Sequence, residues 1–319
     1  MRDFDTVWSE LKPFLDGFEA RRKKAVRQVA IGGVAAVGLA ALTVVLLSQT
    51  GLPGPMIFFA AMAAAFGAYT LGSRRMTALS REVKAALNDR LAEAFGLRYA
   101  QTPASPVHFS EFASHGLIPN SDRRSFEDHF AGESHGAEFE LYEAHLQQRR
   151  RSRRRTYYVT VFRGVLIRIA FPRTIEGVTL VTRDRGIFNA FERWAKSAGR
   201  HGLARIGLPD PKFNSIFEVY GTDQVMARYL VTPSFMERLL ELEDALRGKN
   251  VRAVFDEGLA EGEGRGEMLI AADTGNLFEP GSLFTPMSDR ARIEALYRDF
   301  ALVERIISII LEPARVDGL

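Results

Sequence analysis

A long apolar run dominates the N-terminal third of the chain. Between Arg27 and Arg74 there are 46 consecutive positions without Asp, Glu, Lys or Arg. Because a helix rises about 1.5 Å per residue, a bilayer core about 30 Å thick needs roughly 20 apolar residues. This run is long enough to cross twice, and the sequence GLPGP at residues 51–55 interrupts it where the chain would reverse. The pattern predicts two membrane-spanning helices, Val29–Leu47 and Met56–Gly72.

Helical periodicity continues on both sides of the two spans. Before them, apolar side chains recur at steps of three and four residues: Phe4, Trp8, Leu11, Leu15 and Phe18. This stripe predicts an amphipathic arm over residues 1–24, although Pro13 and Gly17 weaken the pattern. The arm fits the membrane interface, with Trp8 as an anchor, as well as it fits the surface of the protein. A second stripe predicts a helical stalk over residues 74–97: Leu79, Val83, Leu87, Leu91 and Phe95.

Residues 98–319 show the shorter patterns of a folded domain. Segments rich in Val, Ile, Tyr and Phe predict strands at Ala137–Leu146, Thr156–Arg163, Val165–Phe171, Val178–Thr182, Ile216–Tyr220, Val251–Asp256 and Glu267–Ala272. Helices are predicted at Ile187–Ser197, Asp223–Leu230, Thr232–Arg247 and Ser288–Leu311. Gly164 is interpreted as a turn or bulge between two strands. Regular alternation of strand and helix is missing, so the predicted fold class is α+β, with a mixed, mostly antiparallel sheet and flanking helices.

Positive charge near the spans predicts the orientation, because cytoplasmic flanks retain Lys and Arg. Five basic residues precede the first span and three follow the second: Arg21, Arg22, Lys23, Lys24, Arg27, Arg74, Arg75 and Arg81. The turn between the spans has none, so both chain ends are expected in the cytoplasm. The alternative is a cleavable secretory signal, but the first apolar run is long, starts late and is followed at once by a second.

Charge in the remaining chain is concentrated at one point. Six of the seven positions from 149 to 155 are arginine: Arg149, Arg150, Arg151, Arg153, Arg154 and Arg155. Without this cluster the formal net charge falls from +3 to −3, so the chain lacks the generally basic surface of a nucleic-acid-binding fold. Cysteine is absent, which excludes disulfides, thiolate metal sites and a cysteine nucleophile.

The arginine cluster lies between two predicted strands and is the strongest candidate for a binding site. On a domain tethered to a bilayer it would contact anionic lipid, with about 1 kcal/mol from each basic residue near the surface. Nucleic-acid phosphate is a weaker alternative, because no aromatic residue interrupts the cluster, although Tyr157 and Tyr158 follow it. A solvated loop without a ligand is the third interpretation.

No residue is predicted to be catalytic, to bind a cofactor or to bind a metal. Histidine and acidic residues are concentrated in one segment: His108, His115, Glu127, Asp128, His129, Glu133, His135 and His145. Their spacing matches no known metal frame. An enzyme hypothesis requires at least three of six residues to meet in one pocket: His108, His115, Glu127, Asp128, His129 and His135. The glycine-rich residues 262–266 join two predicted strands and carry acidic side chains, so they are interpreted as a turn and not as a phosphate loop.

One stretch resembles a known family. It contains Phe213, FEVYG at 217–221, DQ at 223–224, ARY at 227–229, TP at 232–233 and FMERL at 235–239. This pattern resembles the signature of a bacterial family known as domain of unknown function 3137. The signature positions are Glu218, Tyr220, Asp223, Gln224, Arg228, Tyr229, Pro233 and Met236. Weaker similarities, at Asp122–Gly132, Phe162–Val165 and Phe278–Phe284, extend the likeness over Phe109–Leu311.

The resemblance implies a bacterial inner-membrane protein with an N-terminal pair of spans and a cytoplasmic α+β domain. It implies no catalytic residues, because the family has no established activity. From the residues alone, Asp223 and Thr232 are expected to cap the helices that follow them.

These patterns together predict the organisation of the chain and a class of function. The predicted parts are an arm (1–24), a transmembrane hairpin (25–73), a stalk (74–97) and a cytoplasmic domain (98–319). The first hypothesis is a non-catalytic module at the inner face of the bacterial inner membrane, which binds a protein partner or anionic lipid and needs no cofactor. A membrane-bound enzyme using segment 108–145 and nucleic-acid binding through Arg149–Arg155 are the alternatives.

Small residues in the first span bear on the oligomeric state. Gly32, Gly33, Ala36 and Gly38 would permit close approach of another helix. That contact fits either the second span of the same hairpin or another copy of the chain.

Overall fold

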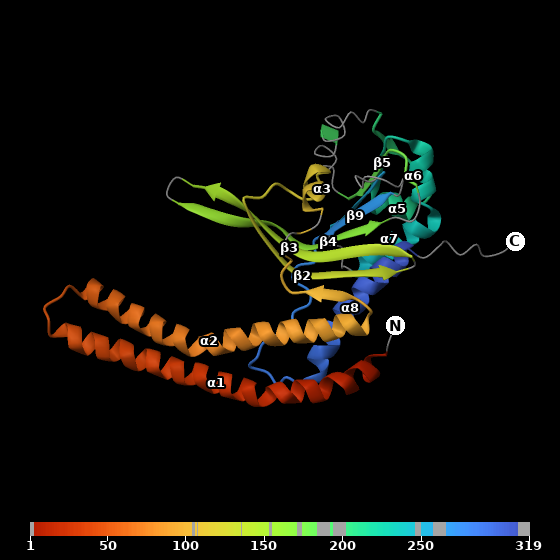
Figure 1. Cartoon of the computed structure of the whole chain (residues 1–319). Helices are drawn as coiled ribbons and strands as arrows, with labels where there is room; N and C mark the ends of the chain where they lie inside the picture. Colours follow the sequence, from red (N-terminus) through yellow and green to blue (C-terminus); the bar gives the residue numbers. More distant parts are fainter. Residues whose placement is uncertain are drawn as a thin grey trace. The chain divides into compact units, whose positions relative to one another are not determined.

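The computed structural model describes residues 3–103, 106, 108–134, 136–152, 155–170, 174–183, 192–193, 202–245, 250–257 and 266–311. They form two compact units, Met1–Ala94 with Glu279–Tyr297, and Phe95–Phe278 with Arg298–Leu319. The first unit is helical and the second is built on an antiparallel sheet (Figure 1). The predicted α+β fold class is confirmed.

Two long helices form most of the first unit, α1 (Phe4–Ser48) and α2 (Gly54–Ala94) (Figure 1). The predicted arm and first span are one continuous helix, as are the second span and the stalk. Pro13 lies inside α1, where its missing N–H removes one helical hydrogen bond. The helix continues through it because the neighbouring Leu11 and Leu15 are buried. Gly51, with φ of 70°, lies in the turn between the helices.

The apolar stripes of the arm and the stalk are covered by protein. On α1 the buried members are Leu11 and Leu15, with Val7 buried beside them, and on α2 they are Leu79, Val83, Leu87 and Leu91. Within the first unit, the ring of Phe4 lies 5.3 Å from that of Tyr297, and the guanidinium of Arg90 lies 4.1 Å from the ring of Phe14. Of the two environments that fit the arm, the structure favours the surface of the protein.

A segment distant in sequence completes the first unit. It consists of Glu279–Tyr297 and includes the beginning of α8 (Arg290–Leu311). The ammonium of Lys84 lies 2.7 Å from a carboxylate oxygen of Glu279, and Arg22 Nη1 donates to the carbonyl of Leu283 at 3.1 Å. Part of the C-terminal chain therefore folds together with the N-terminal helices.

In the described residues, the second unit contains a nine-stranded sheet in which every pair is antiparallel. The strands are β1 (Arg98–Ala100), β2 (Arg123–Ser134), β3 (Ala137–Arg151), β4 (Thr156–Ala170), β5 (Val178–Thr182), β6 (Ala204–Ile206), β7 (Glu218–Gly221), β8 (Val251–Asp256) and β9 (Glu267–Ala272). Their order is β1-β2-β3-β4-β9-β8-β5-β7-β6. The helices other than α8 are α3 (Phe109–Ser114), α5 (Pro211–Ile216), α6 (Gln224–Leu230) and α7 (Pro233–Ala245).

Aromatic side chains fill both faces of the sheet. On one face, Phe112 and Leu117 from α3 and its following turn join Tyr142 in a buried cluster. Successive residues of a strand point to opposite faces, so Phe130, which pairs with Leu141, lies on the other face from Tyr142. There the ring of Phe130 lies 4.7 Å from that of Phe278. The sheet thus has apolar packing on both sides.

Three predictions about elements need correction. Thr156–Arg163 and Val165–Phe171, predicted as two strands, are one strand that runs through Gly164. Glycine is required there because a Cβ would lie 1.9 Å from the carbonyl oxygen of Ala272, so it permits a close backbone approach and not a turn. β2 was not predicted. The segment predicted as the strand Ile216–Tyr220 begins instead with the end of α5. The helix predicted at Ile187–Ser197 lies outside the described residues except for Glu192 and Arg193.

Candidate anion-binding sites

The predicted arginine cluster forms the free end of the β3–β4 hairpin. In the last pairs of the hairpin, Arg149 lies opposite Tyr158, Arg150 opposite Tyr157 and Arg151 opposite Thr156. The turn is closed by the N–H of Ser152, which donates to the carbonyl of Arg155 at 2.9 Å. β2 pairs with β3 no further than Gln147, so residues 148–152 and 155–159 project from the sheet as a two-stranded ribbon (Figure 1). We call these residues the arginine hairpin.

Asp122 holds the base of the arginine hairpin. Its carboxylate accepts from the N–H of Arg149 at 2.7 Å, and its own N–H donates to the carbonyl of Gln147 at 2.9 Å. The guanidinium of Arg123 lies 5.0 Å from the ring centroid of Tyr158, within cation–π distance. A free two-stranded ribbon is only marginally stable in water, so these contacts favour a fixed direction for the projecting end.

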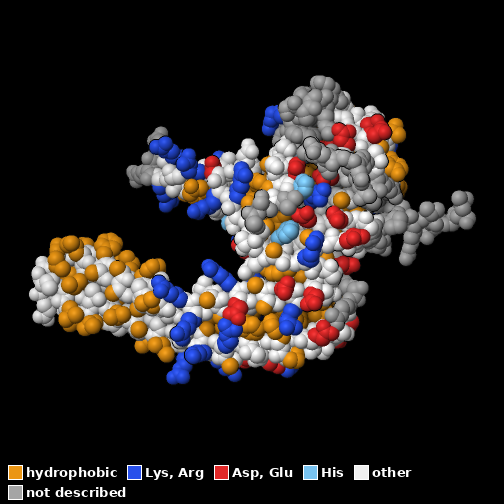
Figure 2. Space-filling view, in the orientation of Figure 1, with side chains coloured by type: hydrophobic (Ala, Val, Ile, Leu, Met, Phe, Trp, Pro, Cys, Tyr) orange, Lys and Arg blue, Asp and Glu red, His pale blue; other side chains and the backbone are white. Residues whose placement is uncertain are grey.

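The pairing register places a tyrosine beside two of the arginines. Directly opposite side chains in an antiparallel pair lie on the same face, so Arg149 shares one face with Tyr158 and Arg150 shares the other with Tyr157. Both tyrosines are 46% exposed, and Lys and Arg side chains gather at this end in Figure 2. In the sequence Tyr157 and Tyr158 only follow the arginine cluster, and the pairing of β3 with β4 brings them beside these two arginines. Arg153 and Arg154 lie outside the described residues.

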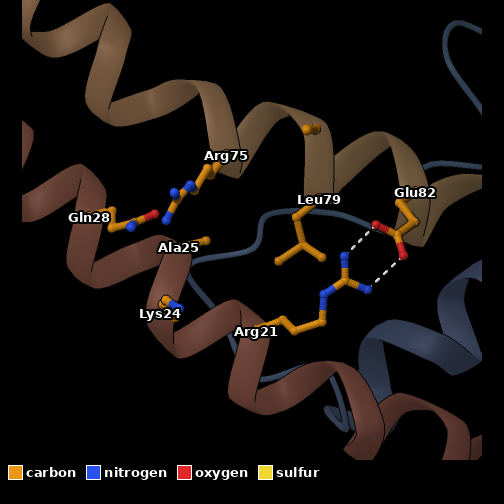
Figure 3. A pocket seen from close by; sticks show the side chains of 8 residues that line it. Arg21, Lys24, Ala25, Gln28, Arg75, Leu79 and Glu82 are labelled. Atoms are coloured by element: carbon orange, nitrogen blue, oxygen red, sulfur yellow. Dashed lines mark hydrogen bonds and ion pairs between the residues drawn. The ribbon is translucent and has the colours of Figure 1, made fainter.

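A second basic site lies in the first unit, in an open cavity of about 320 Å³ between α1 and α2 (Figure 3). We call it the interhelical cavity. Its polar lining residues are Arg21, Lys24, Gln28, Arg75 and Glu82. Its apolar lining residues are Ala25, Ala78 and Leu79. In the sequence its three basic residues are recognisable only as flanks of the predicted spans.

One of the three cations of the interhelical cavity is already paired. Arg21 donates from both terminal nitrogens to the carboxylate of Glu82, each at 2.6 Å (Figure 3). This hydrogen bonding raises the pKa of Arg21 and lowers the pKa of Glu82. Lys24 and Arg75 form no hydrogen bond or ion pair with any residue that the structure describes. Three cations and one carboxylate therefore leave the cavity with a formal charge of +2.

The two helices approach closely beside the cavity, at Gly32 and Gly72. A Cβ on Gly32 would lie 2.9 Å from the Cα of Gly72, and a Cβ on Gly72 would lie 2.8 Å from the Cα of Gly32. Only glycine fits at both positions without moving the helices apart. Of the small residues noted in the sequence, Gly32 therefore makes its contact within the hairpin. A Cβ added to Gly33 or Gly38 would have no atom within 4 Å, so these two glycines take no part in that contact.

The histidine and acidic segment does not form one site in the described residues. The Nδ1 of His108 lies 2.6 Å from the carboxylate of Glu111, and the Nε2 of His129 lies 3.3 Å from that of Glu140. No three of the described candidates between 108 and 133 bring ligand atoms within 4.8 Å of one another. His135 lies outside the described residues. The convergence that the enzyme hypothesis requires is not found in this part of the chain.

His115 has a structural role. It is buried, and its Nε2 lies 2.8 Å from the carboxylate of Asp256 while its Nδ1 lies 2.7 Å from the carbonyl of Glu111. Both neighbours are acceptors, so the two ring nitrogens are used to tie α3 to β8. A histidine bonded in this way has no ring nitrogen left to serve as a base or a metal ligand.

His145 lines a different, very small cavity with Glu143 and Arg163. Its volume is about 30 Å³, enough for one water molecule. The Nε2 of His145 lies 2.8 Å from the hydroxyl of Thr160. Burial, and then the charge of Arg163, lower the pKa of His145. This cavity is too small to hold an organic substrate.

The signature residues of the 213–239 stretch build local structure. Asp223 caps α6, accepting from the N–H of Val225 at 2.7 Å and from that of Met226 at 2.8 Å, as expected. Thr232 accepts from the N–H of Phe235 at 3.2 Å, so it caps α7, whose first residue is Pro233. These bonds begin the two helices in succession.

The other signature residues divide between the sheet, the core and the surface. The hydroxyl of Tyr220 donates to the carboxylate of Glu218 at 2.7 Å, and Met236 is buried. The exposed signature residues are Gln224, Arg228 and Tyr229 on α6 and Pro233 at the start of α7. The signature therefore describes a folded motif and shows no set of groups that meet for chemistry.

Comparison with known proteins gives one family and one distant structure. No curated protein matches the chain. A solved structure, the crystal structure of the mycobacterial trehalose monomycolate transport factor A, TtfA, is similar with 9% identity and a TM-score of 0.32, covering 70% of this chain and 96% of that chain. That score is too low to show a common fold.

The family match agrees with the resemblance noted in the sequence. The family described as Protein of unknown function (DUF3137) matches residues 160–311, which include the whole 213–239 stretch and Phe278–Phe284. The weaker similarity at Asp122–Gly132 lies outside the matched range. The segment of residues 160–311, with most of β4, strands β5 to β9 and helices α5 to α8, thus matches the DUF3137 family.

Proposed function

We propose that this chain is a membrane-anchored, non-catalytic module of the bacterial inner membrane. In this proposal α1 and α2 cross the bilayer, and the sheet domain lies in the cytoplasm, where it binds a protein partner. The arginine hairpin contacts anionic lipid. One observation carries the proposal: the apolar surface that α1 and α2 expose between two basic flanks.

The exposed apolar surface is concentrated on one part of the chain. Of the twenty-two large hydrophobic side chains that are exposed in the described residues, sixteen lie between Ile31 and Leu71. Figure 2 shows this end of the two helices covered with hydrophobic side chains and without Lys, Arg, Asp or Glu. A contiguous apolar surface of this kind is unfavourable in water and suits lipid as the solvent.

Length and burial separate these helices from core helices of soluble proteins. Their most apolar windows have mean hydropathies of 2.4 and 1.5, which is enough to cross a membrane by composition. Core helices pass the same test but are mostly buried, whereas these windows are only 11% and 6% buried. The predicted first span, Val29–Leu47, would be about 28 Å long, close to the bilayer core of about 30 Å.

The residues before the first span belong to the folded unit, which argues against a cleavable signal. Arg22 donates from Nε and Nη2 to the carboxylate of Glu19, and from Nη1 to the carbonyl of Leu283. Cleavage after the first apolar run would remove these contacts together with the buried stripe of the arm. The basic flanks at both ends of the hairpin support cytoplasmic termini.

Single cysteines test the topology directly, because the natural chain has none. Gln49→Cys labels the turn between the spans, and Ser152→Cys labels the tip of the arginine hairpin. With a membrane-impermeant maleimide on intact cells, we expect Gln49→Cys to react and Ser152→Cys to react only after the inner membrane is permeabilised. Labelling of Ser152→Cys in intact cells, or recovery of the chain in the soluble fraction, would contradict the proposal.

Two features of the arginine hairpin support a contact with lipid headgroups. The chain has no acidic residue between Glu143 and Glu176, so nothing within this stretch of sequence offsets the six arginines. Arginines occur on both faces of the ribbon, and Tyr157 and Tyr158 are exposed beside them. Tyrosine and arginine together suit the interface between water and lipid, where one end of each side chain is apolar.

Nucleic-acid binding is the second candidate, favoured by the same arginine–tyrosine pairing. A fluorophore on Ser152→Cys in nanodiscs, with a quencher on phosphatidylglycerol or on phosphatidylcholine, distinguishes the two. Lipid contact predicts stronger quenching from phosphatidylglycerol, which is lost when Arg149, Arg150 and Arg151 become Ser. Equal quenching from both lipids, together with binding of RNA or DNA that falls steeply with salt, would favour nucleic acid.

A further inference from the structure

We propose that the interhelical cavity binds the phosphate ester of an anionic lipid headgroup, an inference that rests on the membrane anchoring proposed above. Lys24 and Arg75 supply the charge that holds the phosphate. Gln28 lies on α1 between Lys24 and Val29, the residue at which the predicted first span begins. The site is distinct from the arginine hairpin, which belongs to the other compact unit.

The cavity lies at the depth where headgroups would be found. The predicted spans begin at Val29 and end at Gly72, and Gln28 and Arg75 are within one helical turn of those residues. Lys24 lies about one turn further, so the cationic groups start within about 5–8 Å of the apolar core. The headgroup layer on each side of a bilayer has about this thickness, since the whole bilayer measures about 40–45 Å.

The way the helices meet explains why the cavity exists. On one side of it, Gly32 and Gly72 bring the two backbones into contact. On the other side, Arg21 and Glu82 bridge the helices with long side chains. Between these two contacts the facing residues include Ala25 and Ala78, whose methyl groups are too short to fill the space. The cavity is therefore a consequence of residue size along the helix pair.

Charge and hydrogen bonding suit a phosphate ester. A formal charge of +2 remains after Glu82 neutralises Arg21, because Lys24 and Arg75 form no hydrogen bond or ion pair among the described residues. In Figure 3 the side chains of Arg75 and Gln28 point toward one another across the cavity. An incoming phosphate oxygen would accept from Arg75 and Lys24, and the amide of Gln28 can bond to a headgroup hydroxyl.

The lining favours a lipid over a free anion. The floor of Ala25, Ala78 and Leu79 gives apolar contact that an inorganic phosphate cannot use. A volume of about 320 Å³ is at the lower end for a ligand site, enough for a headgroup with its glycerol but not for acyl chains. The acyl chains would continue along the exposed apolar side chains of α1 and α2 between Ile31 and Leu71. Basic pockets between membrane helices on the cytoplasmic side commonly bind anionic headgroups in this way.

The chain offers a matched pair of variants to test this site. Lys24→Gln with Arg75→Gln removes two charges that line the cavity. Arg27→Gln with Arg74→Gln removes two charges at nearly the same depth from residues that do not line it. Ala78→Leu is a third variant, which fills the cavity without changing charge.

The measurement is native mass spectrometry of the full-length protein in an uncharged detergent, titrated with phosphatidylglycerol. We expect binding to the Lys24→Gln/Arg75→Gln variant to be about thirty-fold weaker than to the wild type, which corresponds to about 2 kcal/mol at 1.4 kcal/mol per tenfold. The Arg27→Gln/Arg74→Gln variant should stay within about threefold, because charges outside the cavity act on the lipid only through a screened field. Ala78→Leu should weaken binding by about tenfold or more.

Two further titrations decide whether the bound phosphate belongs to a lipid or to a soluble molecule. Glycerol 3-phosphate in the same titration should fail to displace phosphatidylglycerol at millimolar concentration, and phosphatidylcholine should bind more weakly. Displacement by glycerol 3-phosphate would overturn the assignment to lipid in favour of a soluble phosphate. Equal loss of binding in the two double variants, or unchanged binding in Ala78→Leu, would overturn the site itself. All variants should still fractionate with the membrane, so a failure of anchoring is recognised separately.

Discussion

Replacing Gly32 by alanine tests the helix contact on which the interhelical cavity depends. The new Cβ would lie 2.9 Å from the Cα of Gly72, so α1 and α2 must separate by at least 0.5 Å to reach the 3.4 Å of ordinary contact. The neighbouring Gly33 has no atom within 4 Å of the same added carbon. Gly33→Ala therefore adds the same methyl group to the same helix without the contact.

The expected magnitude follows from two opposing effects. Alanine is favoured over glycine inside a helix by about 1 kcal/mol, and this gain is common to both variants. An extra methyl group in a packed contact costs about 1–3 kcal/mol because the neighbouring backbone must move. Gly33→Ala should thus be neutral or slightly stabilising, and Gly32→Ala should be less stable than Gly33→Ala by about 1–3 kcal/mol.

The assay is unfolding of the full-length protein in mixed micelles at increasing SDS. The fluorescence of Trp8 reports on the first unit, since Trp8 lies on α1 with its ring 6.3 Å from that of Phe4. All variants carry Trp194→Phe, which leaves Trp8 as the only tryptophan. Gly32→Ala should lower the SDS midpoint relative to Gly33→Ala and should also weaken phosphatidylglycerol binding, because one side of the cavity moves. If the two variants unfold at the same midpoint, the helices do not meet at Gly32.

The other predictions concern the sheet domain and its pH dependence. Gly164→Ala should lower the free energy of unfolding by about 3 kcal/mol or more, seen as a lower thermal unfolding temperature, because its Cβ would lie 1.9 Å from a backbone oxygen. Gly207→Ala should be neutral, because a Cβ there has open space. Asp223→Ala should cost about 1 kcal/mol in denaturant unfolding and Asp223→Asn much less, since asparagine also caps. Burial and the charge of Arg163 lower the pKa of His145 in the folded protein, so as pH falls the unfolded chain binds this proton first. The free energy of unfolding should therefore fall as pH drops from about 7 through the ordinary histidine pKa near 6.5. His145→Gln should remove that part of the pH slope.

Elements with long or local patterns could be predicted from the sequence. The two long helices follow from an apolar run and its stripes, and α8 follows from a stripe of buried residues that continues for several turns. The caps Asp223 and Thr232 were predicted because an N-cap bonds only to residues two or three positions away. The β8–β9 hairpin is predicted because two segments rich in apolar residues flank a glycine-rich stretch, and both strands are fully buried in the structure.

β2 could not be predicted, for a physical reason. A strand is recognised by strict alternation, and the register of β2 with β3 shifts between Glu127 and Phe130. Phe126 and Phe130 therefore lie on opposite faces although they are four residues apart. Asp128, at the shift, has φ of 52° and accepts a hydrogen bond from Tyr99. A bulge of this kind removes the period that the prediction uses.

The two candidate sites differ in how far the sequence reveals them. Six arginines in seven positions are visible in composition, so the arginine hairpin was predicted, but the tyrosine beside Arg149 was not. That pairing depends on the register of two strands, which the turn and the sheet decide together. The interhelical cavity joins Lys24 to Arg75, about fifty positions apart, and its shape depends on a glycine contact that neither segment shows alone.

The basic flanks carry two kinds of information that the structure allows to be separated. Orientation in a membrane depends on how many Lys and Arg residues lie near the spans, and not on which way each side chain points. A binding site depends on the direction of individual side chains, and here Lys24 and Arg75 line the cavity while Arg27 and Arg74 do not. The two double variants lose the same charge, so they should keep the same topology and differ in lipid binding. A charge pattern that serves orientation alone would give no such difference, which is why the comparison of these variants tests the cavity and not merely the presence of a membrane.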